Sequence, residues 1–600
     1  MATAPEHTAA AEVPFTAGSQ RRAGQRSYSV PIVVAVTGHR DLVDAELPVI
    51  RSRIRDCLFG LRYAYPSRII VVMSALAEGA DRLVAEEALA LGMPLSVVLP
   101  MPRDLYEQDF DTAESRRQFD TLCATSHDVF ELPLAPGSNE QAIAEQGPAR
   151  TRQYAQVGVF LCAHCHVLLA LWDGKESDQL GGTSQVVQFH HHDYMPGYTP
   201  RAAASRLNLT EDESDLVYHV VCSRNRPDGS PAAGLKPLDA FWFTTDEHTP
   251  RSAEMPARHR RVFAHTNEFS REAQAFAEPI GRECYPLLTP EQSRDLPPGL
   301  GDINQVFCAA DWLAIRYQKK VVTTLKVGHV CALLTGIGYI SYTDLATTPI
   351  IIAMIIVLML ASVGTNALAV RGSWHRKYLD YRTLAEGLRV QFYWAAAGVT
   401  SGNVTKFAHD NFLQMQDAEL GWIRNVMRVA GTECDANPHL DPAGLRFALR
   451  EWIGDDTSGQ LGYYRAKSRR RILEHRTTEK IGRLGIWVTI VALAALLFVG
   501  SAIPVVLKTP VVVTMGAVLL MVGVRQSYAK STAEAELIKQ YEFMYRIFHN
   551  ARRRIDEAEA DADKRRLLKV LGDAALEEHA QWILIHRERS IDEKEGLKLG

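Results

Sequence analysis

The sequence lacks three features that would each indicate a broad functional class. It has no excess of basic residues, since 66 Lys and Arg against 70 Asp and Glu give a net charge of -4, so we expect no nucleic-acid partner. Its nine cysteines have no regular spacing, which predicts reduced, buried thiols rather than a disulfide framework. Residues 1–28 carry no apolar signal-peptide core, and we interpret them as a disordered leader.

Long apolar runs are present in the second half of the chain. Residues 321–340 and 348–370 each provide about the 20 residues that a helix needs to cross a bilayer. The polar residues 341–344 are the expected turn between them. Lys326 carries the one full charge within these runs, near enough to a helix end for its side chain to reach the interface. This pair predicts a transmembrane hairpin.

A second, shorter pair of apolar runs lies within residues 485–525, with its turn expected at residues 504–510. A hairpin buried in a protein core is the alternative interpretation. Four apolar runs in two tight hairpins flanked by basic clusters favour membrane insertion instead. We therefore predict an all-α, multi-pass membrane domain and a lipid bilayer as one partner.

Basic residues flank both hairpins, whereas the two turns contain only Lys508. By the positive-inside rule, both turns face outward. The sequence thus predicts an inner-membrane protein whose N-terminal part, connector (residues 371–484) and C-terminal helices (residues 526–600) are cytoplasmic. The basic residues are Arg316, Lys319, Lys320, Arg371, His375, Arg376, Lys377, Arg469, Arg470, Arg471, Arg476, Lys480, Arg483, Arg525 and Lys530.

The N-terminal part alternates between buried-strand and helix patterns. Residues 30–36, 68–73, 95–99 and 167–171 are apolar runs of strand length, and helical periodicity separates the first three of them. Such alternation predicts an α/β domain over residues 30–195, with a doubly wound, Rossmann-like parallel sheet.

Glycine-containing turns follow three of these strands. Ligands of doubly wound sheets bind at the carboxyl ends of the strands, where exposed backbone amides and helix N-termini attract phosphate. We therefore predict a nucleotide-derived ligand at this edge, without a metal ion or another cofactor. The candidate residues are Thr37, Gly38, His39, Arg40, Ser74, Glu78, Gly79, Ala80, Asp81, Trp172, Gly181, Gly182 and Thr183.

Asp81 allows three interpretations. It is a candidate general base, a partner for a ribose hydroxyl, or an N-terminal cap of the helix that begins near Arg82. No nucleophile or second acid accompanies it at a recognisable spacing. We therefore favour a binding role, assign no catalytic residue and expect a binding protein rather than an enzyme.

Two motifs match chemistries that we do not expect here. Residues 162–166 have the spacing of a c-type haem attachment motif, but they lie in a domain expected in the cytoplasm. The tract 190–193 is rich in His, but we expect it on a loop with no partner cluster for a metal ion.

The region from residue 196 to 301 is irregular, and the strand-like run 216–222 within it is either an added edge strand or part of an insert. From residue 302, a helical pattern continues into the first apolar run. Apolar stripes at helical spacing, which include Tyr381 and Phe548, recur after each hairpin. They belong either to a bundle core within one chain or to a subunit interface.

The N-terminal motifs resemble those of the SLOG superfamily, the Rossmannoid group of DprA and the LOG enzymes. The resemblance rests on residues 37–40, 74–81, 170–174 and 181–183. It implies a domain that binds nucleotides or nucleotide-derived ligands. The LOG hydrolases carry Pro-Gly-Gly-x-Gly-Thr-x-x-Glu, and this chain has Gln179-Leu180-Gly181-Gly182-Thr183-Ser184-Gln185 instead, which argues against hydrolysis.

The helical half resembles the SLATT group of SLOG-associated membrane proteins, which are proposed to be pore-forming effectors in bacterial conflict systems. The matching segments are residues 310–318, 381–389, 462–464 and 540–544. That group has one hairpin, and this chain has two. The combination implies a homo-oligomeric sensor-effector in which the ligand controls a pore. A membrane-tethered N-glycosidic hydrolase and a ligand-controlled scaffold are the alternatives.

Overall fold

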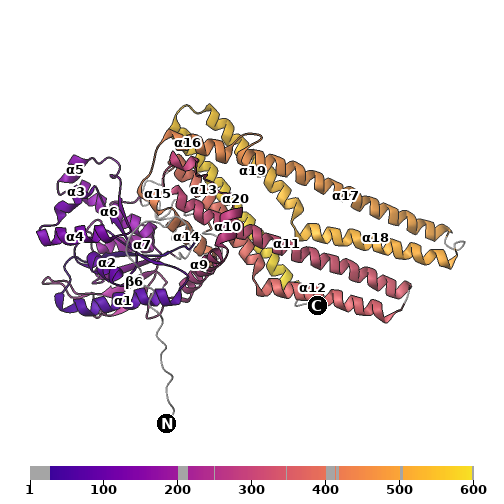
Figure 1. Ribbon diagram of the computed structural model, residues 1–600, viewed down its shortest axis with the longest axis horizontal. Helices are drawn as coiled ribbons and strands as arrows, with labels where there is room; N and C mark the ends of the chain where they lie inside the picture. Colours follow the sequence, from indigo (N-terminus) through magenta and orange to yellow (C-terminus); the bar gives the residue numbers. More distant parts are fainter. Residues whose placement is uncertain are drawn as a thin grey trace, which may run out of the picture. The chain divides into compact units, whose positions relative to one another are not determined.

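The chain divides into two compact units, residues 1–277 with 401–410 and residues 278–400 with 411–600. Figure 1 shows an α/β unit and a helical unit. The predicted leader lies outside the described residues apart from Tyr28. A computed structural model describes residues 28–200, 214–246, 248, 250–345, 347–399, 412–413, 418–499 and 504–596.

The first unit contains an eight-stranded sheet in the order β4-β3-β2-β1-β5-β6-β7-β8. Neighbouring strands from β4 to β6 pair in parallel, and β7 and β8 add two antiparallel pairings. The parallel-rich α/β sheet predicted from the sequence is therefore present. The strands are β1 Ile32–Gly38, β2 Ile70–Ser74, β3 Leu95–Leu99, β4 Asp128–Glu131, β5 Val167–Trp172, β6 Val217–Val221, β7 Ala240–Phe243 and β8 Arg251–Ser252.

The strand-like run 216–222 forms β6, which pairs with β5 on one side and with β7 on the other. It is not an edge strand, because it is hydrogen-bonded to a strand on each side. All five of its residues are buried, as expected for a strand covered on both faces. The sheet therefore extends beyond residue 195, the predicted end of the α/β domain.

Helices pack on both faces of the sheet (Figure 1). Alternate residues of β1, Ile32, Val34 and Val36, join one core with apolar residues of α1, α2 and α4, whereas α6 and α7 pack on each other and on β1. The helices are α1 Leu47–Ala64, α2 Ala80–Ala90, α3 Arg103–Tyr106, α4 Ala113–Thr125, α5 Glu140–Ala144, α6 Pro148–Ala163, α7 Thr183–His192 and α9 Ala257–Ala275.

The second unit is helical. α11 runs unbroken for 45 residues, as the helical pattern from residue 302 predicted, and its first half packs on α13. The helices are α10 Ala277–Glu283, α11 Leu300–Asp344, α12 Pro349–Arg371, α13 Trp374–Ala397, α14 Gly421–Ala430, α15 Thr432–Ala436, α16 Pro442–Ala448, α17 Gly459–Val499, α18 Val505–Ser531, α19 Glu534–Glu557 and α20 Asp561–Gly596.

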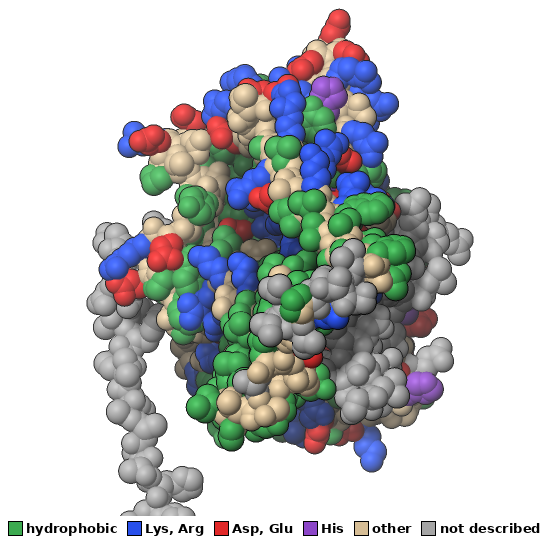
Figure 2. Space-filling view, turned by 90° about the vertical axis from the view of Figure 1, so that its right-hand side faces the viewer, with side chains coloured by type: hydrophobic (Ala, Val, Ile, Leu, Met, Phe, Trp, Pro, Cys, Tyr) green, Lys and Arg blue, Asp and Glu red, His purple; other side chains and the backbone are tan. Residues whose placement is uncertain are grey.

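Four helices, α11, α12, α17 and α18, are long and apolar enough to cross a membrane. In α12, Val357 and Leu360 have exposed fractions of 64% and 65%. Figure 2 faces the free ends of these helices, and hydrophobic side chains gather in the middle of the view. Large apolar side chains are thus left uncovered by the rest of this unit.

Both predicted hairpin turns are displaced. Residues 341–344 belong to α11, which ends at Asp344. Within it, the Thr343 hydroxyl donates to the carbonyls of Tyr339 and Ile340 at 3.2 and 3.1 Å. α18 begins at Val505, so the predicted turn residues 505–510 belong to this helix. Pro510 lies inside α18, where its ring nitrogen cannot donate a helical hydrogen bond.

The four long helices form an open row in the order α12, α11, α18, α17 (Figure 1). α11 and α18 join the two hairpins, with Gly336 facing Leu520 and Gly516 facing Ile340. Nearer the bundle, the rings of His329 and Tyr528 lie 5.3 Å apart. The hairpins are staggered, because α17 and α18 extend beyond the ends of α11 and α12 (Figure 1).

The stripe residues of the helical unit pack inside one chain. Tyr381 and Phe392 on α13 and Phe548 on α19 are fully buried, so these positions belong to a bundle core. Arg382 on α13 binds Asp311 of α11 at 3.3 Å and also pairs with Glu386, which in turn pairs with Arg389 at 2.7 Å. Charged residues from separate sequence motifs thus meet in the same core.

Candidate functional site

The candidate site lies at the carboxyl edge of the sheet, where the chain changes direction. From β1 the chain moves through α1 to β2, whereas from β5 it moves through α7 to β6 on the opposite side. β1 and β5 are neighbours, so the loops that follow them diverge to opposite faces. In open α/β sheets such a topological switch point is where ligands bind.

Two glycines bring the ends of β1 and β2 into contact. The backbone N–H of Ala80 donates to the carbonyl of His39 at 3.1 Å. A Cβ atom on Gly38 would lie 2.4 Å from the Ala80 Cβ, and one on Gly79 would lie 2.4 Å from the Arg40 carbonyl oxygen. Gly79 also has a φ of +81°, which favours glycine. Glycine therefore permits this close backbone approach.

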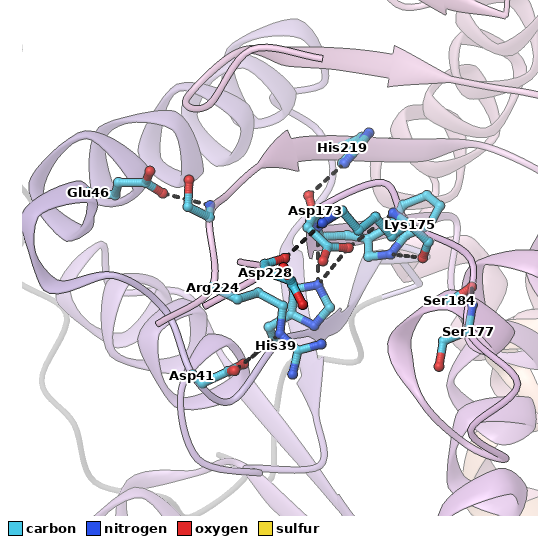
Figure 3. A network of polar contacts seen from close by, with 12 residues as sticks. His39, Asp41, Glu46, Asp173, Lys175, Ser177, Ser184, His219, Arg224 and Asp228 are labelled. Carbon is cyan, nitrogen blue, oxygen red and sulfur yellow. Dashed lines mark hydrogen bonds and ion pairs between the residues drawn. The ribbon is translucent and has the colours of Figure 1, made fainter. Parts of the chain in front are cut away.

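His39 and Asp173 form a buried pair across the switch point (Figure 3). The Nε2 atom of His39 lies 3.1 Å from both the backbone nitrogen and the Oδ1 atom of Asp173. One ring nitrogen can accept the N–H when deprotonated or donate to Oδ1 when protonated, but it cannot do both. Which of the two atoms Nε2 bonds to therefore depends on whether Nε2 carries a hydrogen, which the tautomer of a neutral imidazole already determines.

The two oxygens of the Asp173 carboxylate differ in their hydrogen bonds. Its Oδ1 atom accepts the backbone N–H of Lys175 at 3.0 Å, whereas its buried Oδ2 atom has no hydrogen-bond partner among the described residues. Burial acts to raise the pKa of Asp173, but the hydrogen bonds from His39 and Lys175 outweigh it and lower the pKa below its ordinary value. Asp173 is therefore a carboxylate with one unused acceptor.

The loop after β6, residues 223–238, covers this pair. Arg224 binds the Asp41 carboxylate at 2.8 Å, and the Lys175 ammonium donates to the Asp228 carbonyl at 2.8 Å (Figure 3). The backbone N–H of Ala232 donates to the Asp173 carbonyl, also at 2.8 Å. The loop is thus attached by polar contacts to residues that follow β1 and β5.

Asp81 lies at the start of α2, beside the contact between the two glycine turns. Its side chain is 6% exposed, and its Oδ2 atom accepts the backbone N–H of Ala77 at 3.4 Å. Burial raises the pKa of Asp81 to about 7, against smaller opposing effects of Ala77, Arg40 and Arg82. Arg40 is exposed. An uncovered guanidinium thus lies near a carboxyl group that titrates at neutral pH, a combination typical of functional sites.

Three other predicted residues hold the turns in place. Ser74 accepts the Leu76 N–H at 3.1 Å and donates to the Asp81 carbonyl at 3.3 Å. Glu78 accepts a hydrogen bond from the Ser115 hydroxyl of α4. Trp172 donates from its indole nitrogen to the Lys175 carbonyl at 3.1 Å. These contacts fix the conformation of the turns that follow β2 and β5.

The third glycine turn, Gly181 to Thr183, forms the N-terminus of α7. Gly181 has a φ of +74°, and a Cβ atom there would lie 2.8 Å from the Ala155 backbone nitrogen of α6. The Ser184 hydroxyl accepts the Ser177 N–H at 3.1 Å. The turn follows β5 and so belongs to the same edge, but these contacts attach it to α6 and to its own loop.

The structure thus brings Thr37–Arg40 directly against Gly79–Asp81, and it places Gly181–Thr183 one connection away. Our list of candidate residues omitted Asp173, Asp41 and Arg224. Asp173 had a detectable signal, since it is an acidic residue directly after a buried strand. Arg224 had none, because it meets Asp41 across 183 residues of sequence.

The haem-like motif at residues 162–166 and the His tract at residues 190–193 both lie in well-packed parts of the α/β unit. Cys162 and Cys165 are buried in the core. The His tract is the last turn of α7, not a loop, because the helix continues to His192. His190 lies within it, fully buried, with its Nε2 atom 3.2 Å from the Leu216 carbonyl.

The comparisons with known proteins assign no family to this arrangement. No family model matches the chain, and no curated protein matches its sequence.

Proposed function

We propose that the protein is a multi-pass membrane sensor-effector. In this proposal, the α/β unit binds a nucleotide-derived ligand at the switch point, and the ligand controls a pore formed by the long helices. The observation that carries it is the presence, in one chain, of a glycine-lined switch point and four helices of bilayer-spanning length. The resemblance to SLOG and SLATT proteins extends the proposal to a bacterial defence system.

The ligand assignment is supported by the chemistry of the edge. Arg40 offers an exposed guanidinium, and an Arg side chain forms charge-assisted, often bidentate hydrogen bonds with phosphate. The N-terminus of α7 carries Thr183 and Ser184, where hydroxyl groups and the helix dipole favour an anion. We expect the phosphate of the ligand to bind between these two features.

The membrane assignment is supported by the exposed apolar helices and by charge placement. Basic residues cluster at one end of each long helix pair, as Lys319, Lys320 and Arg371 do for the first hairpin. We propose insertion in the cell inner membrane, with both hairpin ends outside and both termini in the cytoplasm.

The open helix row favours a homo-oligomer. α12 and α17 are the outer members of the row, and α11 and α18 lie between them. A single row does not enclose a channel, so a pore requires several copies arranged around a common axis. A ligand shifts such an assembly only if it binds the open state more tightly than the closed state.

The proposal is tested with the full-length protein in liposomes that contain a self-quenched dye. We expect at least one ligand from a panel of AMP, GMP, ADP, GDP and ADP-ribose to bind and to cause leakage. Arg40→Ala should weaken binding by about ten- to a hundredfold, the loss expected for a charged hydrogen bond. Arg271→Ala is the matched control, because Arg271 is an exposed arginine on α9. Absence of leakage with every ligand would refute the pore.

A second candidate function is supported by Asp81. A carboxyl group with a pKa raised to about 7 is suited to general acid-base catalysis at neutral pH. In a membrane-tethered N-glycosidic hydrolase, Asp81 would activate water. Chromatography of the ligand after incubation separates the two functions. Intact ligand supports the sensor, whereas release of a free base that is abolished in Asp81→Asn supports the hydrolase.

A further inference from the structure

The Oδ2 atom of Asp173 is a buried polar atom at the switch point that the described contacts leave unsatisfied. Asp173 is 1% exposed, and its Oδ1 atom already receives the Lys175 N–H and contacts His39. Oδ2 has no hydrogen-bond partner among the described residues. A buried carboxylate oxygen left without a donor is energetically costly, so a donor from outside the chain would offset that cost.

The surroundings restrict the chemistry of that donor. An ionised carboxylate only accepts hydrogen bonds and repels phosphate. The nearby side chains of Arg224 and Lys175 are cationic, which disfavours a bound cation. Metal ions require several ligands, and the described residues include no group of three His, Cys, Asp or Glu side chains that could hold one. A neutral hydroxyl group satisfies these conditions.

We propose that Asp173 binds a ribose hydroxyl of the ligand, so that the α/β unit selects ribonucleotides over their deoxy forms. This inference rests on the proposed function, because it assumes a nucleotide at the switch point. The phosphate lies toward Arg40 and the sugar toward the His39–Asp173 pair. Arg40 follows β1 and Asp173 follows β5, so a single nucleotide that contacts both residues bridges the two diverging loops.

The covering loop determines access to this oxygen. Ala232 bonds to the Asp173 carbonyl, and a Cβ atom on Gly174 would lie 2.3 Å from the Leu235 side chain. Solvent therefore does not reach Oδ2 while the loop is in this position. Residues 223–238 must move for the sugar to enter, and their contacts through Arg224 and Lys175 are polar and reversible.

The experiment compares sugars on the full-length protein in lipid nanodiscs by calorimetry. Each of AMP, GMP, ADP, GDP and ADP-ribose that binds is measured beside its 2′-deoxy and 3′-deoxy analogues. We expect removal of one of the two hydroxyls to weaken binding by about ten- to a hundredfold. In Asp173→Asn, which retains an acceptor for the Lys175 N–H, that preference should fall to about fivefold or less.

Asp228→Asn is the matched control. It removes one negative charge from the covering loop, where the side chain is exposed and the described contact of Asp228 uses its backbone carbonyl. The control should keep the full preference for ribose. Equal affinity for ribose and deoxyribose ligands in the native protein would overturn this inference and leave the sensor intact. Binding of no ligand in the panel would overturn both, and an unchanged preference in Asp173→Asn would assign the hydroxyl to another residue.

Discussion

Burial of Asp81 at the switch point lowers the free energy of unfolding at neutral and higher pH. Its pKa is raised from 3.8 to about 7, first because of burial, so the folded state binds its proton more tightly than the unfolded state. The stability that this proton provides is fully present below about pH 4, is lost as the pH rises to about 7, and changes little above that. A buried carboxylate retained at such a cost is typical of binding and catalytic sites.

We therefore predict that Asp81→Asn stabilises the protein at pH 8 relative to the native chain. The difference should grow between about pH 4 and pH 7 and reach the order of 4 kcal/mol. Thermal unfolding of both proteins at a series of pH values measures it. Asp228→Asn, a change at an exposed position, should show no such trend. A pH-independent difference for Asp81→Asn would mean that Asp81 stays ionised in the folded state.

At the scale of elements, the contact between β1 and α2 determines the geometry of the site. Gly38→Ala should destabilise the α/β unit by about 1–3 kcal/mol, the usual cost of overpacking, because the new Cβ would lie 2.4 Å from the Ala80 Cβ. Gly60→Ala is the matched control in the middle of α1, where a Cβ atom meets nothing within 4 Å. It should stabilise the helix by about 0.5–1 kcal/mol.

Denaturation of the full chain in detergent, followed by tryptophan fluorescence, compares the two glycine variants. Opposite signs are the expected result. If both substitutions are stabilising, the turns at Gly38 and Gly79 do not hold β1 and α2 in this close contact.

Elements formed by residues close together in sequence could be predicted, whereas elements that depend on distant pairings could not. β1, β3 and β5 are largely apolar runs, and such runs are visible in the local sequence. β4 was missed because its four residues are largely exposed and include two acids, a pattern that only its pairing with β3 makes a strand. The first hairpin turn was misplaced because a polar residue at a helix end, such as Thr343, can bond to the preceding turn instead of ending the helix.

The same distinction between local and distant interactions applies to the candidate site. Glycines after strands identified Gly38 and Gly79 because turn geometry is local. The cover provided by Arg224 depends on a pairing distant in sequence, and the sequence had left residues 216–222 as either an edge strand or an insert. The sequence could not predict that the Oδ2 atom of Asp173 lacks a hydrogen-bond donor. That property depends on which groups the fold places around the carboxylate.

At the scale of the whole molecule, the topology across the membrane is testable by labelling. We expect Thr347→Cys and Pro504→Cys, at the ends of the two hairpins, to react with an impermeant thiol reagent in intact cells. Glu559→Cys, in the connection between α19 and α20, should react only after permeabilisation. All three positions are exposed.

The native background for this labelling is low, because eight of the nine cysteines are buried and Cys284 is partly exposed. Cys284→Ser removes the remaining signal. Labelling of Glu559→Cys in intact cells, with Thr347→Cys unreactive, would place the termini outside.

The stagger of the two hairpins has a mechanical consequence in a bilayer. The basic residues before the first span end at Lys320, whereas Tyr528, between Arg525 and Lys530, meets α11 at His329. At 1.5 Å per residue, the basic residues of the first hairpin and those of the second are offset by about 14 Å along α11. This offset is close to half the thickness of a hydrocarbon core of about 30 Å. A flat membrane cannot match both hairpins at once, so it must thin beside one of them or the hairpins must slide along α11 and α18. Lipid chain length therefore becomes a variable that acts on the relative position of the two hairpins.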